Sequence, residues 1–190
     1  MIGFGRYNLL FKLAQGGMGV LYLARQKTLK RYCALKVIHS HLSEDRGCAD
    51  RFLREARAAA SLSHPNLVGI YDCDQYDGQY FIAMEFIEGM TLGDIIRTCG
   101  HLPLPLALAW LHQAALAMDY VHGRKIIHRD LKPDNMMIDA EGVLKIMDLG
   151  LAKHYFEGDQ IVTTTGTIMG SPHYMSPEQI SDSKTVDLRT

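Results

Sequence analysis

Four side chains that carry or bind charge gather in one short stretch of the chain. Asp130, Lys132, Asn135 and Asp148 lie within the twenty-one residues from His128 to Asp148. An isolated Asp or Asn usually caps a helix or lies solvated in a loop. The order and spacing of the four residues, rather than any one of them, therefore carry the functional argument.

A second feature is a glycine-rich run between two segments that have the composition of strands. Residues 14–19 read Ala-Gln-Gly-Gly-Met-Gly. Glycines in a hairpin let the main chain approach a ligand and direct N–H groups at phosphate oxygens, although most such clusters are plain turns. Further on, Lys36 stands among apolar strand residues. Because an unpaired buried ammonium is unfavourable, Lys36 needs either a partner or a place at the rim of the sheet.

The order of the polar residues resembles a known pattern. The chain reads H-R-D-L-K-P-D-N from His128 and D-L-G from Asp148, which is similar to the catalytic and metal-binding loops of protein kinases. With the glycine-rich run upstream, the chain resembles the bacterial, eukaryotic-like (Hanks-type) serine/threonine protein kinases from about Gly5 to its last residue. The resemblance implies an α+β, two-lobed fold. A β-rich N-lobe with glycine-rich loop and hinge would span residues 1–87, and a helical C-lobe lacking its last helices would span residues 88–190.

The activity that the resemblance implies is phosphoryl transfer from ATP to Ser and Thr hydroxyls of proteins. This reaction needs in-line positioning and cancellation of phosphate charge more than covalent chemistry. By resemblance, Asp130 is the catalytic base and Lys132 reaches the transferred phosphate. Asn135 and Asp148 supply oxygen ligands for Mg²⁺, a hard cation. His128 is a structural residue of the loop.

The resemblance also implies a nucleotide site in the first lobe. Lys36 contacts the phosphates and pairs with Glu55 on the following helix. Ala14 replaces a usual glycine, Leu21 a usual valine and Leu149 the usual phenylalanine after the metal-binding Asp, but we expect nucleotide binding to be retained. The implied nucleotide-binding residues are Leu13, Ala14, Gln15, Gly16, Gly17, Met18, Gly19, Val20, Leu21, Ala34, Lys36, Glu85, Ile87 and Met137.

The elements that position these residues follow from local patterns. Strand-like composition predicts strands over residues 7–13, 19–25, 31–38, 68–73 and 79–86, with a turn at Asp77-Gly78. Helical spacing predicts a helix over residues 49–61, with Phe52, Ala56 and Ala59 or Ala60 inward. A second predicted helix, residues 104–121, carries the apolar stripe Leu104, Ala107, Leu111, Ala114, Met118 and Val121. A short strand over residues 125–127 is expected to lead into the catalytic loop.

The segment after D-L-G is expected to regulate activity. A run of threonines lies between D-L-G and Ser176-Pro177-Glu178, and by position we expect phosphorylation at Thr163 and Thr165. A phosphate there would pair with Arg129 and order the segment. Self-phosphorylation in trans is one route to it. The resemblance further implies that Ser171 contacts Asp130 and Lys132.

Composition sets the remaining limits. A net charge of −1 gives no sign of nucleic-acid binding, and four widely spaced cysteines argue against a disulfide framework or a zinc site. No secretory signal is visible, and the longest apolar run, residues 102–111, is too short to span a bilayer. We therefore expect a cytoplasmic location, with a membrane anchor in a longer native protein left open.

The end of the chain bears on activity. Thr190 precedes the long buried helix that forms the spine of the C-lobe in this family. Two alternatives therefore stay open: a kinase that needs the absent part to work, or a truncated, inactive nucleotide-binding or interaction module. A small-molecule phosphotransferase is disfavoured by the H-R-D-L-K-P and S-P-E strings.

Overall fold

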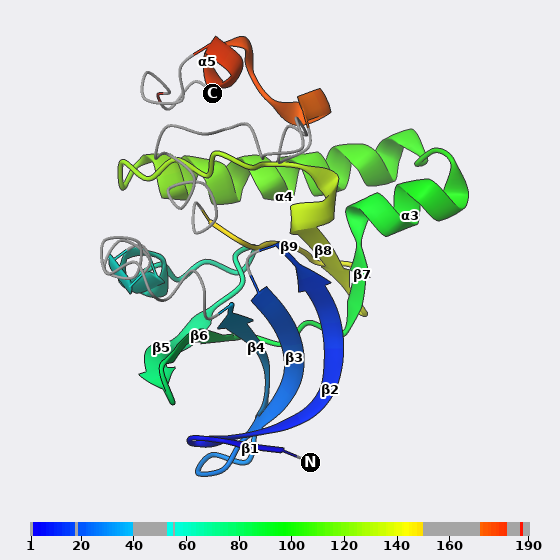
Figure 1. Cartoon of the computed structure of the whole chain (residues 1–190). Helices are drawn as coiled ribbons and strands as arrows, with labels where there is room; N and C mark the ends of the chain where they lie inside the picture. Colours follow the sequence, from blue (N-terminus) through cyan, green and yellow to red (C-terminus); the bar gives the residue numbers. More distant parts are fainter. Residues whose placement is uncertain are drawn as a thin grey trace. The chain divides into compact units, whose positions relative to one another are not determined.

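The computed structural model describes residues 2–17, 19–39, 53–54, 56–149, 172–181 and 187 (Figure 1). Contacts divide the chain into two compact units. The first unit comprises Met1–Ser63 and Val68–Glu88, and the second comprises His64–Leu67 and Gly89–Thr190.

The first unit is built on a six-stranded antiparallel sheet of order β1-β2-β3-β4-β6-β5. Its strands are β1 (Ile2–Phe4), β2 (Tyr7–Gly16), β3 (Gly19–Gln26), β4 (Tyr32–Ile38), β5 (Ile70–Tyr76) and β6 (Gln79–Met84). Five of these are the predicted strands, with ends moved by a few residues. Strand β1 was not predicted, because three residues are too few to show a period. It pairs with β2 through a turn at Gly5, whose φ of +52° favours glycine.

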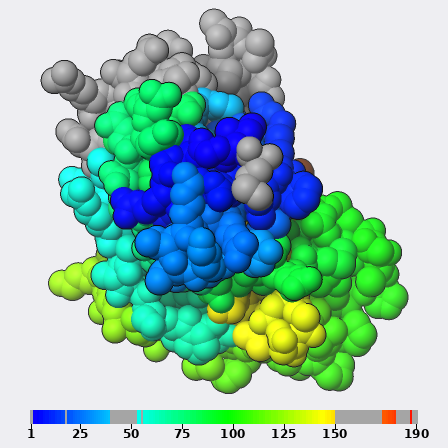
Figure 2. Space-filling view, turned by 90° about the horizontal axis from the view of Figure 1, so that it is seen from below, coloured from blue at the N-terminus to red at the C-terminus, as the bar shows by residue number. Residues whose placement is uncertain are grey.

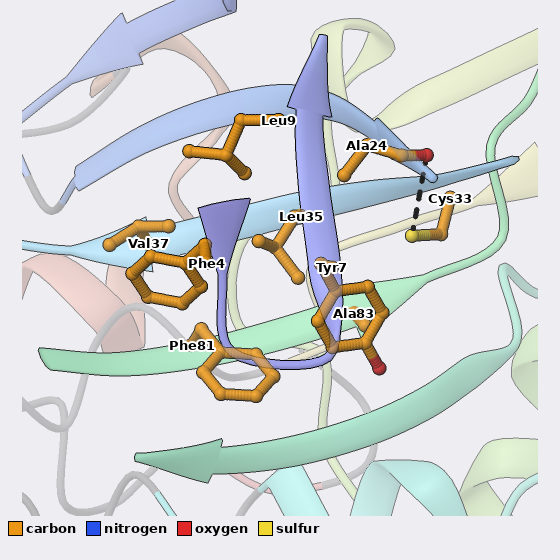
Figure 3. Packing of buried hydrophobic residues seen from close by; sticks show 9 residues of the cluster. All are labelled: Phe4, Tyr7, Leu9, Ala24, Cys33, Leu35, Val37, Phe81 and Ala83. Carbon is orange, nitrogen blue, oxygen red and sulfur yellow. Dashed lines mark hydrogen bonds between the residues drawn. The ribbon is translucent and has the colours of Figure 1, made fainter. Parts of the chain in front are cut away.

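One face of this sheet carries the core of the unit. Phe81 packs edge-on against both Phe4 and Tyr7, with ring centroids 5.6 Å apart in each pair (Figure 3). The Tyr7 hydroxyl donates to Asp72 Oδ2 at 2.7 Å. Burial raises the pKa of the Cys33 thiol to about 11, so this cysteine packs as a small apolar residue. The cluster comprises Phe4, Tyr7, Leu9, Ala24, Cys33, Leu35, Val37, Phe81 and Ala83.

Other parts of the first unit reach its surface or connect its strands. The blue segments of the N-terminal strands are visible at the surface in Figure 2. Ile2 in β1 and Phe11 in β2 are 69% and 67% exposed. Residues 53–54 and 56–60 are helical, as predicted, and Ala56 and Ala59 are buried as expected for the inner face. Phe52 lies outside the described residues.

The second unit combines two helices with a small antiparallel sheet of order β7-β8-β9. The helices are α3 (Leu92–Cys99) and α4 (Leu104–His122), and the strands are β7 (Gly89–Thr91), β8 (Met136–Asp139) and β9 (Leu144–Ile146). The 3₁₀ turn η1 (Pro133–Asn135) leads directly into β8. Further along the chain are the turn η2 (Pro172–Tyr174) and the short helix α5 (Pro177–Ser181).

Helix α4 is confirmed, but part of its predicted inner face is wrong. Leu104 and Leu111 are 70% and 66% exposed, whereas Trp110, Ala114, Ala117 and Val121 are buried. Apolar residues occur on every side of this helix, so periodicity fitted more than one face. The buried face is the one on which the Trp110 ring nitrogen donates to the Gly142 carbonyl at 3.0 Å.

The strand predicted over residues 125–127 is also wrong. Lys125 adopts a φ of +60° in the turn that leaves α4. The N–H of Ile126 donates back to the Val121 carbonyl at 3.3 Å, so the chain here bonds to the helix end rather than to a neighbouring strand.

Candidate active site

Three of the predicted site residues form one bonded group. The Lys132 ammonium lies 2.9 Å from Asp130 Oδ2. Asn135 Nδ2 donates to the same oxygen at 2.9 Å and to the Asp130 carbonyl at 2.7 Å. Asp130 therefore has a fixed orientation, with two donors on one carboxylate oxygen.

The turn η1 explains how these residues meet. Pro133 supplies a fixed φ at the first position of the turn, and the Asn135 N–H donates to the Lys132 carbonyl at 2.9 Å. The chain thereby doubles back, and Asn135, only 7% exposed, comes to face the main chain of Asp130.

The pairing of β8 with β9 brings Asp148 to the same region. Met136 lies opposite Ile146, and one step beyond that pair the Met147 N–H donates to the Asn135 carbonyl at 3.0 Å. Asp148 is the next residue, with a φ of +58° that is uncommon outside glycine. The following Leu149, which replaces the usual phenylalanine, is buried and so still packs as an apolar residue.

The buried ring of His128 bonds to both the segment that holds Asp130 and the segment that holds Met147 and Asp148. The ring is 2% exposed, its Nε2 bonds to the Met147 carbonyl at 3.0 Å, and the Asp130 N–H donates to its Nδ1 at 3.3 Å. These partners assign a neutral ring with the proton on Nε2. Burial lowers the pKa of His128, in agreement with that neutral form.

A contact that the sequence reasoning missed joins the S-P-E-Q segment to the same loop. Gln179 Nε2 donates to the Arg129 carbonyl at 2.6 Å, and Arg129 has a φ of +64°. Ser176 and Gln179 cap the start of α5 reciprocally, with bonds of 3.1 and 3.2 Å. The spacing Ser-x-x-Gln was a visible capping signal, although it did not indicate the bond to Arg129.

The sheet register shows which predicted nucleotide-binding residues of the first unit lie on the same face of the sheet. Residues directly opposite in an antiparallel pair share a face. Leu21 lies opposite Ala14 and Lys36, so these three share a face. Ala34, two residues before Lys36 on β4, lies on that face as well.

Val20 is separated from that group. It lies opposite Val37 and, with Phe4 and Leu9, lines a cavity of about 110 Å³ on the core side of the sheet. The side chain of Val20 therefore faces away from Leu21, against the grouping expected from the sequence.

The hinge segment offers specific main-chain groups. Residues 85–88 follow β6 without regular structure. The Glu85 N–H donates to the Gly69 carbonyl at 2.8 Å, and its carboxylate accepts from the Gly69 N–H at 3.2 Å. These two bonds fix Glu85 against Gly69 at the start of the hinge segment.

The other predicted positions have the following places. Leu13, Gln15, Gly16 and Gly17 are exposed around the β2–β3 turn, Gly19 opens β3, and Ile87 is buried. Met137, in β8, lies between Thr91 and Lys145. Met18, Glu55, Thr163, Thr165 and Ser171 lie outside the described residues.

The donor set suits Mg²⁺ bound together with a nucleotide. The Asn135 amide donates to Asp130 through Nδ2, so its oxygen is the atom that would hold a cation, together with the Asp148 carboxylate. Mg²⁺ typically takes one or two protein oxygens and completes its shell with phosphates and water. Among the described residues, no three His, Cys, Asp or Glu side chains are grouped as an all-protein metal site would need.

One finding concerns membranes. Within the part of the chain that the structure describes, no helix is both long and apolar enough to cross a bilayer.

A two-lobed chain with this loop chemistry matches known proteins along most of its length. Residues 7–188 match the protein kinase domain family. The chain is 41% identical over 175 residues to the serine/threonine-protein kinase PrkC of Bacillus subtilis, covering 92% of this chain and 27% of that protein. It is 39% identical over 178 residues to PknB of Mycobacterium tuberculosis, covering 92% and 28%.

Solved structures agree. The kinase domain of M. tuberculosis PknI matches 80% of this chain and 61% of its own length, with 30% identity and a TM-score of 0.72. A double mutant of that domain matches 99% of this chain and 71% of its own length, with a TM-score of 0.78. The chain belongs to the protein kinase family, and its curated relatives are bacterial serine/threonine kinases. It spans just over a quarter of those relatives' length.

Proposed function

We propose that this chain is the ATP- and Mg²⁺-dependent phosphoryl-transfer region of a serine/threonine protein kinase. The observation that carries the proposal is the bonded group around Asp130. Lys132 and Asn135 both engage Oδ2, which leaves Oδ1 to accept the proton of a substrate hydroxyl. Asp130 is 22% exposed at its side chain, so a hydroxyl can reach it.

The residues around Asp130 would share the neutralisation of the negative charge on the ATP phosphates. Bound MgATP supplies the phosphoryl group and part of its charge neutralisation. The Lys132 ammonium, 2.9 Å from the proposed base, would stabilise the oxygens of the phosphoryl group whose phosphorus the substrate hydroxyl attacks. The Asn135 oxygen and the Asp148 carboxylate would hold Mg²⁺, and the His128 ring keeps the two loops in register.

The first unit would supply the nucleotide site. Lys36, paired with Glu55, would contact phosphate, and the β2–β3 turn would offer main-chain N–H groups. Leu21 and Ala34, on the same face of the sheet as Lys36, would contact the adenine ring together with hinge groups at Glu85 and Ile87.

The substrate would be a protein with Ser or Thr. The curated relatives carry the name serine/threonine-protein kinase, which supports this class. We include the chain itself among its substrates, with transfer in trans at Thr163 and Thr165.

A second candidate is a nucleotide-binding or interaction module without transfer activity. The chain covers 61% and 71% of the length of two solved kinase-domain chains.

Two measurements on one preparation separate the candidates. Isothermal titration with MgATP reports binding, and transfer of labelled γ-phosphate to a generic basic Ser/Thr protein substrate reports activity. The proposed function predicts both, and the module predicts binding alone. If the chain shows neither MgATP binding nor phosphate transfer, both assignments are contradicted. Lys36→Met should abolish transfer, while Arg25→Met, an exposed cation on β3, should leave it unchanged.

A further inference from the structure

Three segments of the second unit meet around one guanidinium. Arg97, in α3, donates from one terminal nitrogen to Asp134 Oδ1 at 2.8 Å and from the other to Asp94 Oδ1 at 2.8 Å. Thr91, at the end of β7, caps α3 by accepting from the Asp94 N–H at 3.0 Å, and its hydroxyl donates to Asp94 Oδ2 at 2.7 Å. The guanidinium thus links the first turn of α3 to Asp134 of η1.

The backbone of α3 is shaped to receive the same carboxylate. Gly93 is buried, and a Cβ added there would lie 2.4 Å from Asp134 Oδ1 and 3.1 Å from an Arg97 terminal nitrogen. Only glycine leaves room for this approach. Two independent features, one bond from the Arg97 guanidinium and the missing side chain at Gly93, therefore hold Asp134 against α3.

The position of Asp134 is passed directly to the candidate site. Asp134 and Asn135 are consecutive residues of η1, a turn of only three residues. Asn135 in turn donates to both the carboxylate and the main chain of Asp130. Asp134 and Asn135 share one tight 3₁₀ turn, so neither residue can move far without the other. A shift of Asp134 should therefore alter the direction of the Asn135 amide.

The Arg97–Asp134 ion pair is exposed, so we expect it to orient the loop rather than to stabilise the fold. The side chains of Arg97 and Asp134 are 60% and 40% exposed, and exposed ion pairs add little to stability. Removing the guanidinium should leave the fold intact while it loosens the loop. This separates a positioning role from a structural one.

We propose that Arg97 and Gly93 are positioning residues for the catalytic loop, holding Asp134 so that the Asn135 amide points its nitrogen at Asp130 and its oxygen at the bound cation. The last link, to the cation, rests on the proposed function, and the links from α3 to Asp130 do not. Arg97 and Gly93 lie outside the H-R-D-L-K-P-x-N string, and Asp134 stands at its variable position, so the string does not specify this contact.

The first test reads the Asn135 amide without any ligand. Asn8, Asn66 and Asn135 are the chain's only asparagines, so protein labelled with ¹⁵N-asparagine gives three side-chain amide signals, and Asn135→Asp assigns one. Arg97→Met and Asp134→Ala should each move the Asn135 signals and leave those of Asn66 unchanged, because the Asn66 amide bonds to Gln113 and Leu144.

Control variants establish whether a shift of the Asn135 signals comes from loss of the Arg97–Asp134 contact. Arg6→Met removes an equally exposed ion pair, Arg6–Asp74 at 2.7 Å, from the other unit and should move no Asn135 signal. Arg97→Lys, which keeps the charge but not the fork, should give a smaller shift than Arg97→Met. The double variant Arg97→Met/Asp134→Ala should move the Asn135 signals no further than either single variant, since both substitutions remove the same contact.

The second test reads the cation. With a non-hydrolysable ATP analogue present, the Mn²⁺ concentration that half-broadens the Asn135 signals should rise about tenfold in Arg97→Met, as for other residues that orient metal ligands. If the unmodified chain neither binds this analogue nor transfers phosphate but Arg97→Met still moves the Asn135 signals, the proposed function fails and the positioning role stands. If the Asn135 signals stay in place in both Arg97→Met and Asp134→Ala, the positioning role is overturned, whatever the activity.

Discussion

Asn135 donates its side-chain amide to Asp130 twice, to Oδ2 at 2.9 Å and to the main-chain carbonyl at 2.7 Å. The residue proposed to bind the cation is therefore also the residue that orients the proposed base. Charge neutralisation and proton acceptance are coupled through one side chain, so a change at Asn135 should affect both.

Asn135→Ala tests this coupling. The substitution leaves the Asp130 carbonyl without its donor in a part-buried position, so the free energy of unfolding should fall by about 1–3 kcal/mol. The Mg²⁺ concentration for half-maximal transfer should rise as well. Urea unfolding and a Mg²⁺ titration of the transfer rate measure the two effects. Asn8→Ala, on the β1-facing part of β2, is the control. A variant that loses stability but keeps its Mg²⁺ dependence would contradict the metal role.

His128 makes stability depend on pH. Its folded pKa lies below the ordinary value of 6.5 because the ring is buried, so below that value the unfolded chain binds more protons than the folded chain. This contribution to the free energy of unfolding is present above pH 6.5 and is lost as the pH falls through and below it. Urea unfolding at steps from pH 7.5 to 5.0 measures the slope.

The comparison for that slope is His128→Asn. This variant should be less stable at neutral pH, because it loses the bonds to Met147 and Asp130. Its stability should fall less steeply below pH 6.5. Equal slopes in the two proteins would show that another group carries the dependence.

Two glycines of the β2–β3 turn should respond differently to alanine. A Cβ at Gly19 would lie 2.1 Å from the Val37 carbonyl oxygen, a main-chain atom that cannot move aside, whereas nothing lies within 4 Å of a Cβ at Gly16. Gly19→Ala should lower the free energy of unfolding by about 2 kcal/mol or more. Gly16→Ala should change it by less than about 0.5 kcal/mol.

Thermal and urea unfolding measure both glycine variants. The two results also inform nucleotide binding, because both glycines are in the proposed phosphate-binding turn. An unfolded Gly16→Ala would mean that this turn is packed more tightly than the open space around Gly16 indicates.

The sequence predicted those parts of the fold that have a local cause. The five long strands alternate or carry β-branched residues between glycine turns, and the loop residues Asp130, Lys132 and Asn135 meet because a proline-led turn brings residues of close spacing together. The register of the sheet, which places Leu21 opposite Lys36, came from the structure and not from the sequence.

The rest depended on partners distant in sequence. The buried face of α4 was chosen by Trp110 reaching Gly142, and Arg97 meets Asp134 across thirty-seven positions, so no periodicity could reveal either. The strand predicted over residues 125–127 is wrong because the Ile126 N–H bonds back to the end of α4, after a turn at Lys125, instead of joining a sheet. Glycine at position 93 was a visible signal, but its meaning required the carboxylate packed against it.

The transfer of labelled γ-phosphate from ATP by this chain, compared with its Asp130→Asn variant, tests the central claim most directly. Asp130→Asn keeps the size of the side chain and removes the proton acceptor, so transfer should fall by about 10²-fold or more while MgATP binding is retained. Asp119→Asn, at an exposed position on α4, should transfer phosphate at the unmodified rate. Equal transfer by the unmodified chain and Asp130→Asn would contradict the assignment of Asp130 as the base and with it the proposed active site.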